Sequence, residues 1–287
     1  MIPNPSIRFA FFGTPDRAVI ALDALKARGL SPALIITQPD RPQGRKLVMT
    51  APAVKVWAQE KGIPFIQPTD LSDASFLKTL KDGDFDMFVV VAYGKILKSE
   101  LLNIPKHGSI NLHASLLPAL RGSCPIETAI LQDLKATGST IIKMDEKMDH
   151  GPILAQRAIA ESKIPQWPLP ADDLAAILVN DGGDLLADAI IGLANGTIKP
   201  VEQDHSKATY TKMIEKEDGR IDLSADPYKN FLKYNAYKGW PGSFFFTDKN
   251  VRVNITDAAY ENGEFVIKKV IPEGKKEISW KEFEKQA

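Results

Sequence analysis

Two polar residues with the chemistry of acyl transfer, Asn111 and His113, are separated by a single leucine. On a β-strand, residues i and i+2 point to the same face of the sheet, so these side chains would lie side by side with Leu112 packed behind them. An amide can hold a developing oxyanion, and an imidazole can relay a proton. An Asn and a His at a strand end are often simple hydrogen-bonded neighbours, so the pair indicates catalysis only in combination with other signals.

A carboxylate that could serve this imidazole occurs in the segment Met144–Pro152. The segment follows an apolar run and ends in Gly-Pro, which is typical of a loop after a strand. From there Asp149 could face His113 and fix its tautomer. The acidic pair 145–146 is interpreted as a solvated turn, and His150 as a loop residue that adjoins Asp149.

The residues between the Asn-Leu-His run and the next expected helix, Ser115–Ile126, suit a close approach to a ligand. A proline near the helix start with small residues before it fits a tight loop. Arg121 could bind an anion there or cap the loop. Cys124 is the single cysteine of the chain, which excludes an internal disulfide and any multi-thiolate metal site. We therefore expect no metal and a reducing compartment.

Composition places the chain among ordinary globular proteins that bury a sizeable core. Of its 287 residues, 44% are hydrophobic and 25% are charged. Lys plus Arg equals Asp plus Glu at 36 each, so no bulk field draws the chain to nucleic acid or membrane, although a local basic patch remains compatible. No apolar run is long enough for a signal-peptide core or a spanning helix. We expect a cytoplasmic protein without membrane contact.

The elements that must position these residues alternate between strands and helices. Apolar runs predict strands at 7–13, 34–36, 85–93, 109–113, 139–145 and 153–161. Helical spacing and boundary residues predict helices at 17–28, 52–62, 124–134 and 171–195, with a loop at 38–46. The alternation favours an α/β fold with a doubly wound, mostly parallel, Rossmann-like sheet. Sites in such sheets gather at strand ends, where His113 lies.

The end of the chain changes character. Aromatic and β-branched runs at 243–247, 251–255 and 264–270 predict a small β-rich, OB-like domain. We predict a catalytic domain over residues 1–200, a linker over 201–212 and this β-rich domain over 213–287.

Taken together, two runs in this order resemble the folate-dependent formyltransferases: N-L-H-A-S-L-L-P-x-L-R-G-S-C-P-I, then M-D-x-x-M-D-H-G-P-I-L. The resemblance implies transfer of a formyl group from 10-formyltetrahydrofolate to an amine, without a metal. It implies that Asn111, His113 and Asp149 are catalytic. The residues that it implies for folate binding are Ser115, Leu116, Leu117 and Pro118 in one loop, Tyr93, Gly94, Ile96 and Leu97 along the pterin pocket, and Met144 in the loop that wraps the pterin.

Further features are similar to the branch of this family whose acceptor is methionyl-initiator tRNA. They are the start Phe12–Asp16, the inserted basic loop Gln38–Leu47, and Arg220–Asp222 with Trp240–Ser243 near the end. The resemblance covers residues 7–247. It implies a monomer that acts in translation initiation and contacts the tRNA acceptor end through Arg41, Arg45 and Lys46.

The sequence departs from that branch in places, and other functions stay open. The basic loop is shorter than usual, Ala119 replaces an arginine, and residues 149–152 are closer to the nucleotide transformylase branch. One alternative is a formyltransferase acting on a nucleotide-linked amino sugar. A second is a hydrolase that releases formate from the same folate, and a third is a non-catalytic tRNA-binding protein.

Overall fold

The computed structural model describes residues 7–44 and 47–286, and the chain divides into two compact units. The first unit holds the residues up to Arg121, together with Gly138–Ile159 and Ala176–Thr209. The second holds Gly122–Thr137, Ala160–Ala175 and the residues from Tyr210 onward. Among the helices of the described ranges, none combines the length and the apolar character needed to cross a bilayer.

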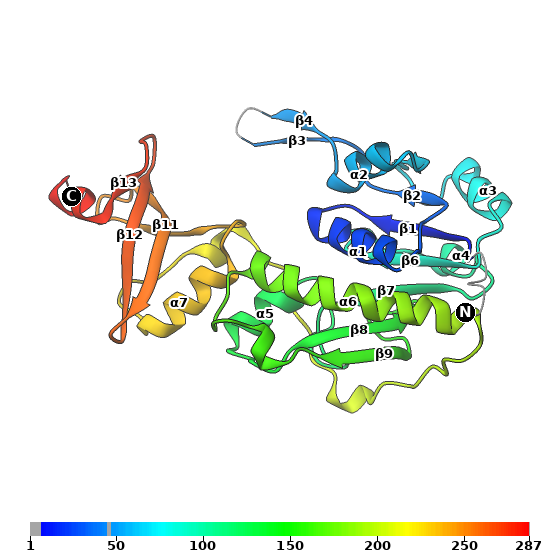
Figure 1. Ribbon diagram of the computed structural model, residues 1–287. Helices are drawn as coiled ribbons and strands as arrows, with labels where there is room; N and C mark the ends of the chain where they lie inside the picture. The colour runs from blue at the N-terminus through cyan, green and yellow to red at the C-terminus, as the bar shows by residue number, and fades with distance from the viewer. Residues whose placement is uncertain (1–6, 45–46, 287) are drawn as a thin grey trace. The chain divides into compact units, whose positions relative to one another are not determined.

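A seven-stranded sheet forms the centre of the first unit, in the order β5-β2-β1-β6-β7-β8-β9 (Figure 1). The four pairs from β5 to β7 are parallel, and β8 and β9 are added antiparallel. The prediction of a mostly parallel, Rossmann-like sheet is therefore confirmed. Its strands are β1 (Phe9–Gly13), β2 (Leu34–Ile36), β5 (Phe65–Ile66), β6 (Met87–Val91), β7 (Ser109–His113), β8 (Gly138–Lys143) and β9 (Ile153–Ala158).

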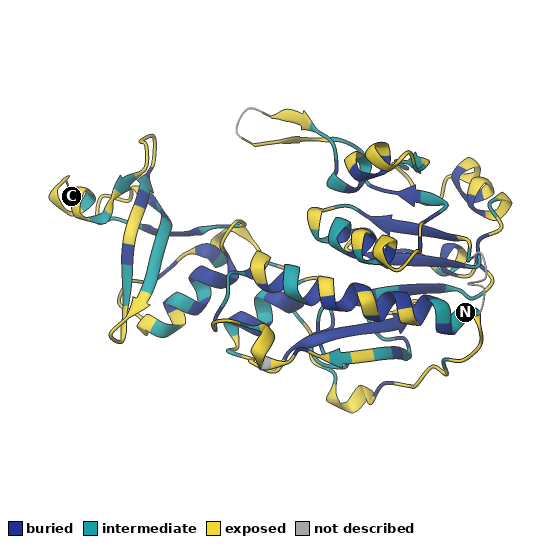
Figure 2. Cartoon of the chain, in the orientation of Figure 1, coloured by how far each residue is buried: buried dark blue, intermediate teal, exposed yellow. Residues whose placement is uncertain are grey.

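Helices cover both faces of this sheet, because its strands are apolar on both sides. In β1, Phe9 and Phe11 pack with α1, α2 and α6, whereas Ala10 and Phe12 pack with α3 and α4. Figure 2 shows the central strands buried along their length. The helices are α1 (Asp16–Ala27), α2 (Ala53–Lys61), α3 (Ala74–Asp82), α4 (Ser99–Leu102) and α6 (Ala171–Ala194).

Local signals end the predicted helices where expected. α2 is preceded by Pro52 and stops at Gly62, whose φ of 66° is the left-handed conformation that glycine adopts at helix ends. α3 was not predicted, although Asp73 caps it by accepting a hydrogen bond from the Phe76 amide at 2.9 Å.

The predicted loop at 38–46 is wrong in part, because it contains one arm of a β-hairpin. β3 (Arg41–Gln43) pairs antiparallel with β4 (Val48–Thr50), and both arms are largely exposed (Figure 2). Pro42 and Gln43 are poor strand formers, so no strand pattern marks them. Arg45 and Lys46, two of the predicted tRNA contacts, lie outside the described residues.

The second unit contains the predicted β-rich region. Its antiparallel sheet runs β10-β11-β12-β13, over a core that includes Ile221, Tyr234 and Val253. β11 extends beyond the predicted 251–255, with a register shift after Ile255. The elements are α5 (Pro125–Leu131), α7 (Pro227–Ala236), β10 (Ser243–Phe246), β11 (Arg252–Glu261), β12 (Glu264–Pro272), β13 (Ile278–Ser279) and α8 (Trp280–Gln286), besides the 3-10 turns η1 (Glu161–Lys163), η2 (His205–Lys207) and η3 (Lys216–Gly219) of the chain.

Segments far apart in the sequence make up the second unit. Asp133 accepts hydrogen bonds from the Trp167 indole at 2.6 Å and from the Tyr228 hydroxyl at 3.0 Å, so one carboxylate ties three stretches of chain together. The boundary between the units falls between Thr209 and Tyr210, and the stretches 122–137 and 160–175 belong to the second unit. The partition into 1–200, 201–212 and 213–287 stays a prediction.

Candidate active site

Asn111 and His113 lie on the same face of β7. The alternate residues of that strand, Ile110 and Leu112, belong to the apolar cluster on the α1 and α6 side of the sheet. The polar pair therefore faces the other side, near the carboxyl end of the strand. His113 is buried and Asn111 is half-buried. Within the described part of the chain, the Asn111 amide makes no hydrogen bond, so its donors are available to a ligand.

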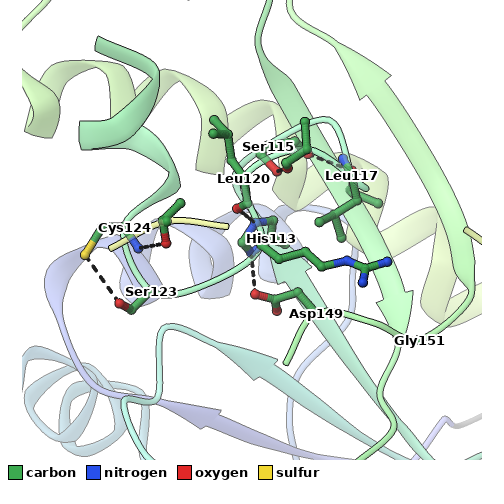
Figure 3. A network of polar contacts seen from close by, with 12 residues as sticks. His113, Ser115, Leu117, Leu120, Ser123, Cys124, Asp149 and Gly151 are labelled. Atoms are coloured by element: carbon green, nitrogen blue, oxygen red, sulfur yellow. Dashed lines mark hydrogen bonds and ion pairs between the residues drawn. The ribbon is translucent and has the colours of Figure 1, made fainter. Parts of the chain in front are cut away.

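The imidazole of His113 lies between two acceptors (Figure 3). Its Nε2 is 2.9 Å from the carbonyl oxygen of Leu120, and its Nδ1 is 3.5 Å from Oδ2 of Asp149. Because a carbonyl can only accept, Nε2 carries the proton of the neutral ring. Nδ1 is thus the atom at which a further proton enters or leaves, beside a carboxylate whose side chain is 15% exposed.

The loop that supplies the Leu120 carbonyl is held by its own hydrogen bonds. The Ser115 hydroxyl donates to the carbonyl of Ala119 at 2.7 Å, and Thr140 of β8 donates to the carbonyl of Ser115 at 2.6 Å. Gln156 donates to the carbonyl of Leu117 at 2.8 Å. Among the predicted folate contacts in this loop, Ser115 and Leu117 are buried, whereas Leu116 and Pro118 are half-buried.

The segment that carries Asp149 folds back tightly. Its start is fixed by the Met144 amide, which donates to the Ser109 carbonyl at 2.8 Å. Asp149 has a left-handed backbone with φ of 49°. A Cβ on Gly151 would lie 1.9 Å from the Lys143 carbonyl oxygen, so this position requires glycine.

Two interpretations of this segment are wrong. Asp145 and His150 are neither merely solvated nor incidental, because His150 Nδ1 lies 2.6 Å from Asp145 Oδ2. The His150 ring also stacks on the His205 ring, with centroids 4.0 Å apart. Nothing in the sequence relates His205 to this loop, because the two histidines are distant along the chain.

The sequence also gives no sign of Gln203 as a member of the site. Gln203 is buried, and its amide nitrogen donates to the carbonyl oxygens of Asp149 and Gly151. For Arg121 the sequence allows either anion binding or capping, and its guanidinium donates to Gln203 and to His205 Nδ1. Gln203 falls in the predicted linker, where a polar residue carries no signal of burial.

The predicted pterin segment is mostly part of the core. Tyr93 is only 2% exposed, its ring contacts the Phe12 ring edge to face, and burial raises the pKa of its phenol to about 12. Leu97 is buried, and Met144 packs against the same apolar cluster. Ile96, in contrast, is 77% exposed. It borders a cavity of about 270 Å³ whose lining includes Leu71, Leu77, Leu101, Lys95 and Lys98.

The hairpin presents apolar and basic groups together. Arg41 is exposed, and Leu47, Val48 and Met49 are 60–70% exposed. At the base of the hairpin, Asp40 accepts from Gln67 at 2.8 Å and from Lys55 at 2.7 Å, and these bonds hold the pKa of its carboxyl below the usual value. The root is therefore anchored, while the outer part is open to a partner.

Comparison with known proteins gives consistent matches. A family model described as formyl transferase matches residues 7–162. The methionyl-tRNA formyltransferase of Anaeromyxobacter sp. (strain K) is 41% identical over 238 residues, which is 83% of this chain and 75% of the relative. That of Thermodesulfovibrio yellowstonii is 37% identical and covers 95% of this chain and 94% of the relative.

Solved structures share the fold. A methionyl-tRNA formyltransferase from Clostridium thermocellum superposes with a TM-score of 0.64 at 17% identity, over 93% of this chain and 98% of that chain. A sugar N-formyltransferase from Shewanella sp FDAARGOS_354 superposes with a TM-score of 0.65 at 17% identity, over 88% of this chain and 98% of that chain. At this identity the structures speak for the fold alone.

Proposed function

The chain belongs to the formyl transferase family, and we propose that it transfers the formyl group of 10-formyltetrahydrofolate to the amino group of methionyl-initiator tRNA. The relatives that cover most of its length carry this acceptor in their names. The geometric observation that supports the proposal most directly is the approach of Asp149 to His113 on the face of β7 that also bears Asn111.

The proposed chemistry uses these three side chains. The unprotonated amine adds to the formyl carbon, and the resulting tetrahedral oxyanion accepts a hydrogen bond from the free amide of Asn111. His113 takes the proton of the amine at Nδ1 and delivers it to N10 of the folate as the carbon–nitrogen bond breaks. Asp149 orients the imidazole and stabilises it while it carries the proton. The products are the formylated amine and tetrahydrofolate, so atoms and protons balance.

We place the folate along the predicted loops. Ser115, Leu116, Leu117 and Pro118 would contact it from one side, and Met144 from the other. Tyr93 and Leu97 would support that wall from within the core, since their side chains are buried, while Gly94 and exposed Ile96 would meet the ligand. The cavity beside Ile96, with apolar walls and two lysines, suits a ligand with a flat ring and carboxylates.

The hairpin is the proposed contact for the tRNA acceptor end. Arg41 can pair with phosphate, as can Arg45 and Lys46 by the sequence prediction. The exposed apolar residues beside them suit the faces of unpaired bases. As part of the same proposal, the protein acts as a cytoplasmic monomer, and gel filtration at working concentration tests its oligomeric state.

The decisive experiment is incubation with 10-formyltetrahydrofolate and charged initiator tRNA, followed by analysis of the aminoacyl product. We expect N-formylmethionyl-tRNA. Formylation of a nucleotide-linked amino sugar instead would identify the sugar branch, and formate release without an acceptor would identify a hydrolase. Binding of tRNA without any turnover would leave a non-catalytic protein and end the proposal.

A further inference from the structure

The segment after α6 returns to the active site. Val201 pairs with Ile153 at the start of β9, through reciprocal backbone hydrogen bonds of 2.7 and 2.8 Å. This pairing sets Gln203, two residues further on, beside the segment that carries Asp149. The side chain of Gln203 is almost completely buried there, at 5% exposure.

Gln203 has its amide fully used. Its nitrogen donates to the carbonyl of Asp149 at 2.9 Å and to the carbonyl of Gly151 at 2.7 Å. Its oxygen accepts from Nη2 and Nε of Arg121, at 2.6 and 3.2 Å. Two carbonyls on one side and a guanidinium on the other allow one orientation of the amide, because carbonyls only accept and a guanidinium only donates.

These bonds bear on the catalytic carboxylate. They fix the carbonyls on both sides of His150, and so the backbone from Asp149 to Gly151. A left-handed aspartate is uncommon and persists only where its surroundings impose it. The direction of the Asp149 side chain, and with it the 3.5 Å approach to His113, follows from that imposed backbone.

Arg121 supports the same arrangement from behind. It is 1% exposed, and a charge so deeply buried requires good partners. Besides Gln203, it donates to His205 Nδ1 at 2.8 Å, and His205 stacks on His150. Its neighbour Leu120 accepts from His113. One buried guanidinium thus sits between the supports of the carboxylate and of the imidazole.

We propose that Gln203 is a positioning residue, which sets the Asp149 carboxylate against His113 by donating to the two loop carbonyls, with Arg121 keeping its amide in register. The role of this geometry in turnover rests on the proposed function. Gln203 touches no reacting atom, so its loss acts on kcat through Asp149 and leaves substrate binding nearly unchanged.

Gln203→Glu separates this role from a merely structural one. Glutamate has the same shape and still accepts from Arg121, but at neutral pH it cannot donate to the carbonyls of Asp149 and Gly151. We expect kcat to fall by about 10²-fold, as for a misplacement of a catalytic group by ~1 Å, with both KM values nearly unchanged. In the background of Asp149→Asn, the same change should cost little more, because the two residues act as one unit.

The matched control is Asn230→Asp. Asn230 is also 5% exposed and donates to a backbone carbonyl, that of Asp222 at 2.7 Å, in the second unit. It loses the same kind of donor, yet we expect kcat to stay within about twofold of the original, since additive effects hold for independent sites. Gln203→Met, of similar length and without polar atoms, replaces Gln203→Glu if the latter does not fold.

A readout independent of turnover distinguishes this proposal from the function. At fixed pH, the NMR signals of the His113 imidazole should shift in the same direction in Gln203→Glu as in Asp149→Asn, and stay in place in Asn230→Asp. If the wild-type protein formylates nothing, the proposed function fails while this comparison still decides on positioning. Unchanged imidazole signals, or a kcat of Gln203→Glu equal to that of the wild type, would overturn the proposal.

Discussion

One imidazole tautomer links the local structure to the proposed chemistry. The Leu120 carbonyl holds the proton of His113 on Nε2, and this leaves Nδ1 for proton transfer beside Asp149. The Asn111 amide, by contrast, is spared from any internal bond in the described chain. The two residues therefore have separable roles, one for the oxyanion and one for the proton.

At this scale we predict that Asn111→Ala lowers kcat by about 10²–10³-fold, because an oxyanion donor is lost. His113→Ala should lower kcat by about 10²–10⁴-fold through loss of the acid–base group. Steady-state kinetics with charged tRNA measures both, and circular dichroism controls for folding. Near-normal rates in both folded variants would contradict the assigned roles.

The residues recoverable from sequence are those with a local pattern. Asn111 and His113 follow from the period of a strand, and Asp149 follows from the resemblance, although its catalytic role stays a prediction. Gln203 and Arg121 are 82 residues apart, and no periodicity joins them. Their contact arises from the path of the chain after α6, which only the folded structure provides.

Elements at the edge of the sheet carry the parts most specific to the proposed acceptor. The β3–β4 hairpin extends from a root held by Asp40, and its outer residues pack on nothing that would bury them. Its existence was missed because Pro42 and Gln43 give no strand signal, whereas Leu34–Ile36 and Ser109–His113 were predicted with their observed bounds. Caps at Asp73 and Asp226 show that α3 and α7 do carry a local signal, which apolar spacing alone overlooks.

For the hairpin we predict that Arg41→Ala and Arg45→Ala raise KM for tRNA and leave KM for the folate unchanged. Each should also reduce the dependence of tRNA affinity on salt, by about one ion for each phosphate that the variant no longer binds. Filter binding over a range of salt concentrations measures this slope. Lys26→Ala removes the same charge from exposed α1 and serves as the control; equal effects in all three variants would argue against the hairpin.

The turn that follows Gln203 gives a prediction for acid stability. Asp204 accepts hydrogen bonds from Ser206, with Lys207 also nearby, and these interactions lower the pKa of its carboxyl to about 2. A folded pKa below the unfolded value of about 3.9 stabilises the folded state above that value, and the benefit disappears as pH falls toward 2. Urea unfolding should therefore show Asp204→Ala less stable than wild type at pH 5, with the difference shrinking toward pH 2. A constant difference over this range would contradict the assignment.

At the scale of the whole molecule, the second unit is discontinuous in sequence. Asp133, Trp167 and Tyr228 come from its three stretches and meet in one hydrogen-bonded group. Composition shift alone located the β-rich strands but not the two earlier stretches, because helix α5 looks like any other helix of an α/β chain.

We predict that Asp133→Ala lowers the free energy of unfolding by about 1–3 kcal/mol, because it leaves two half-buried donors without their acceptor. Amide hydrogen exchange should quicken around Trp167 and Tyr228. Asp82→Ala, which removes an exposed pair with Lys78, is the control and should cost less than about 1 kcal/mol. If both variants lose equal stability, Asp133 does not tie the stretches together.

This discontinuity also bears on how the protein is made. Asp133 and Tyr228 are 95 residues apart, so α5 leaves the ribosome roughly 5–20 s before α7 at ordinary translation speeds. During that interval the apolar side of α5, with Ile126 and Ile130, has not yet met the helix that it contacts in the finished protein. Nascent chains paused in this window expose a sticky helix, and they are the ones that a chaperone or a protease would capture first.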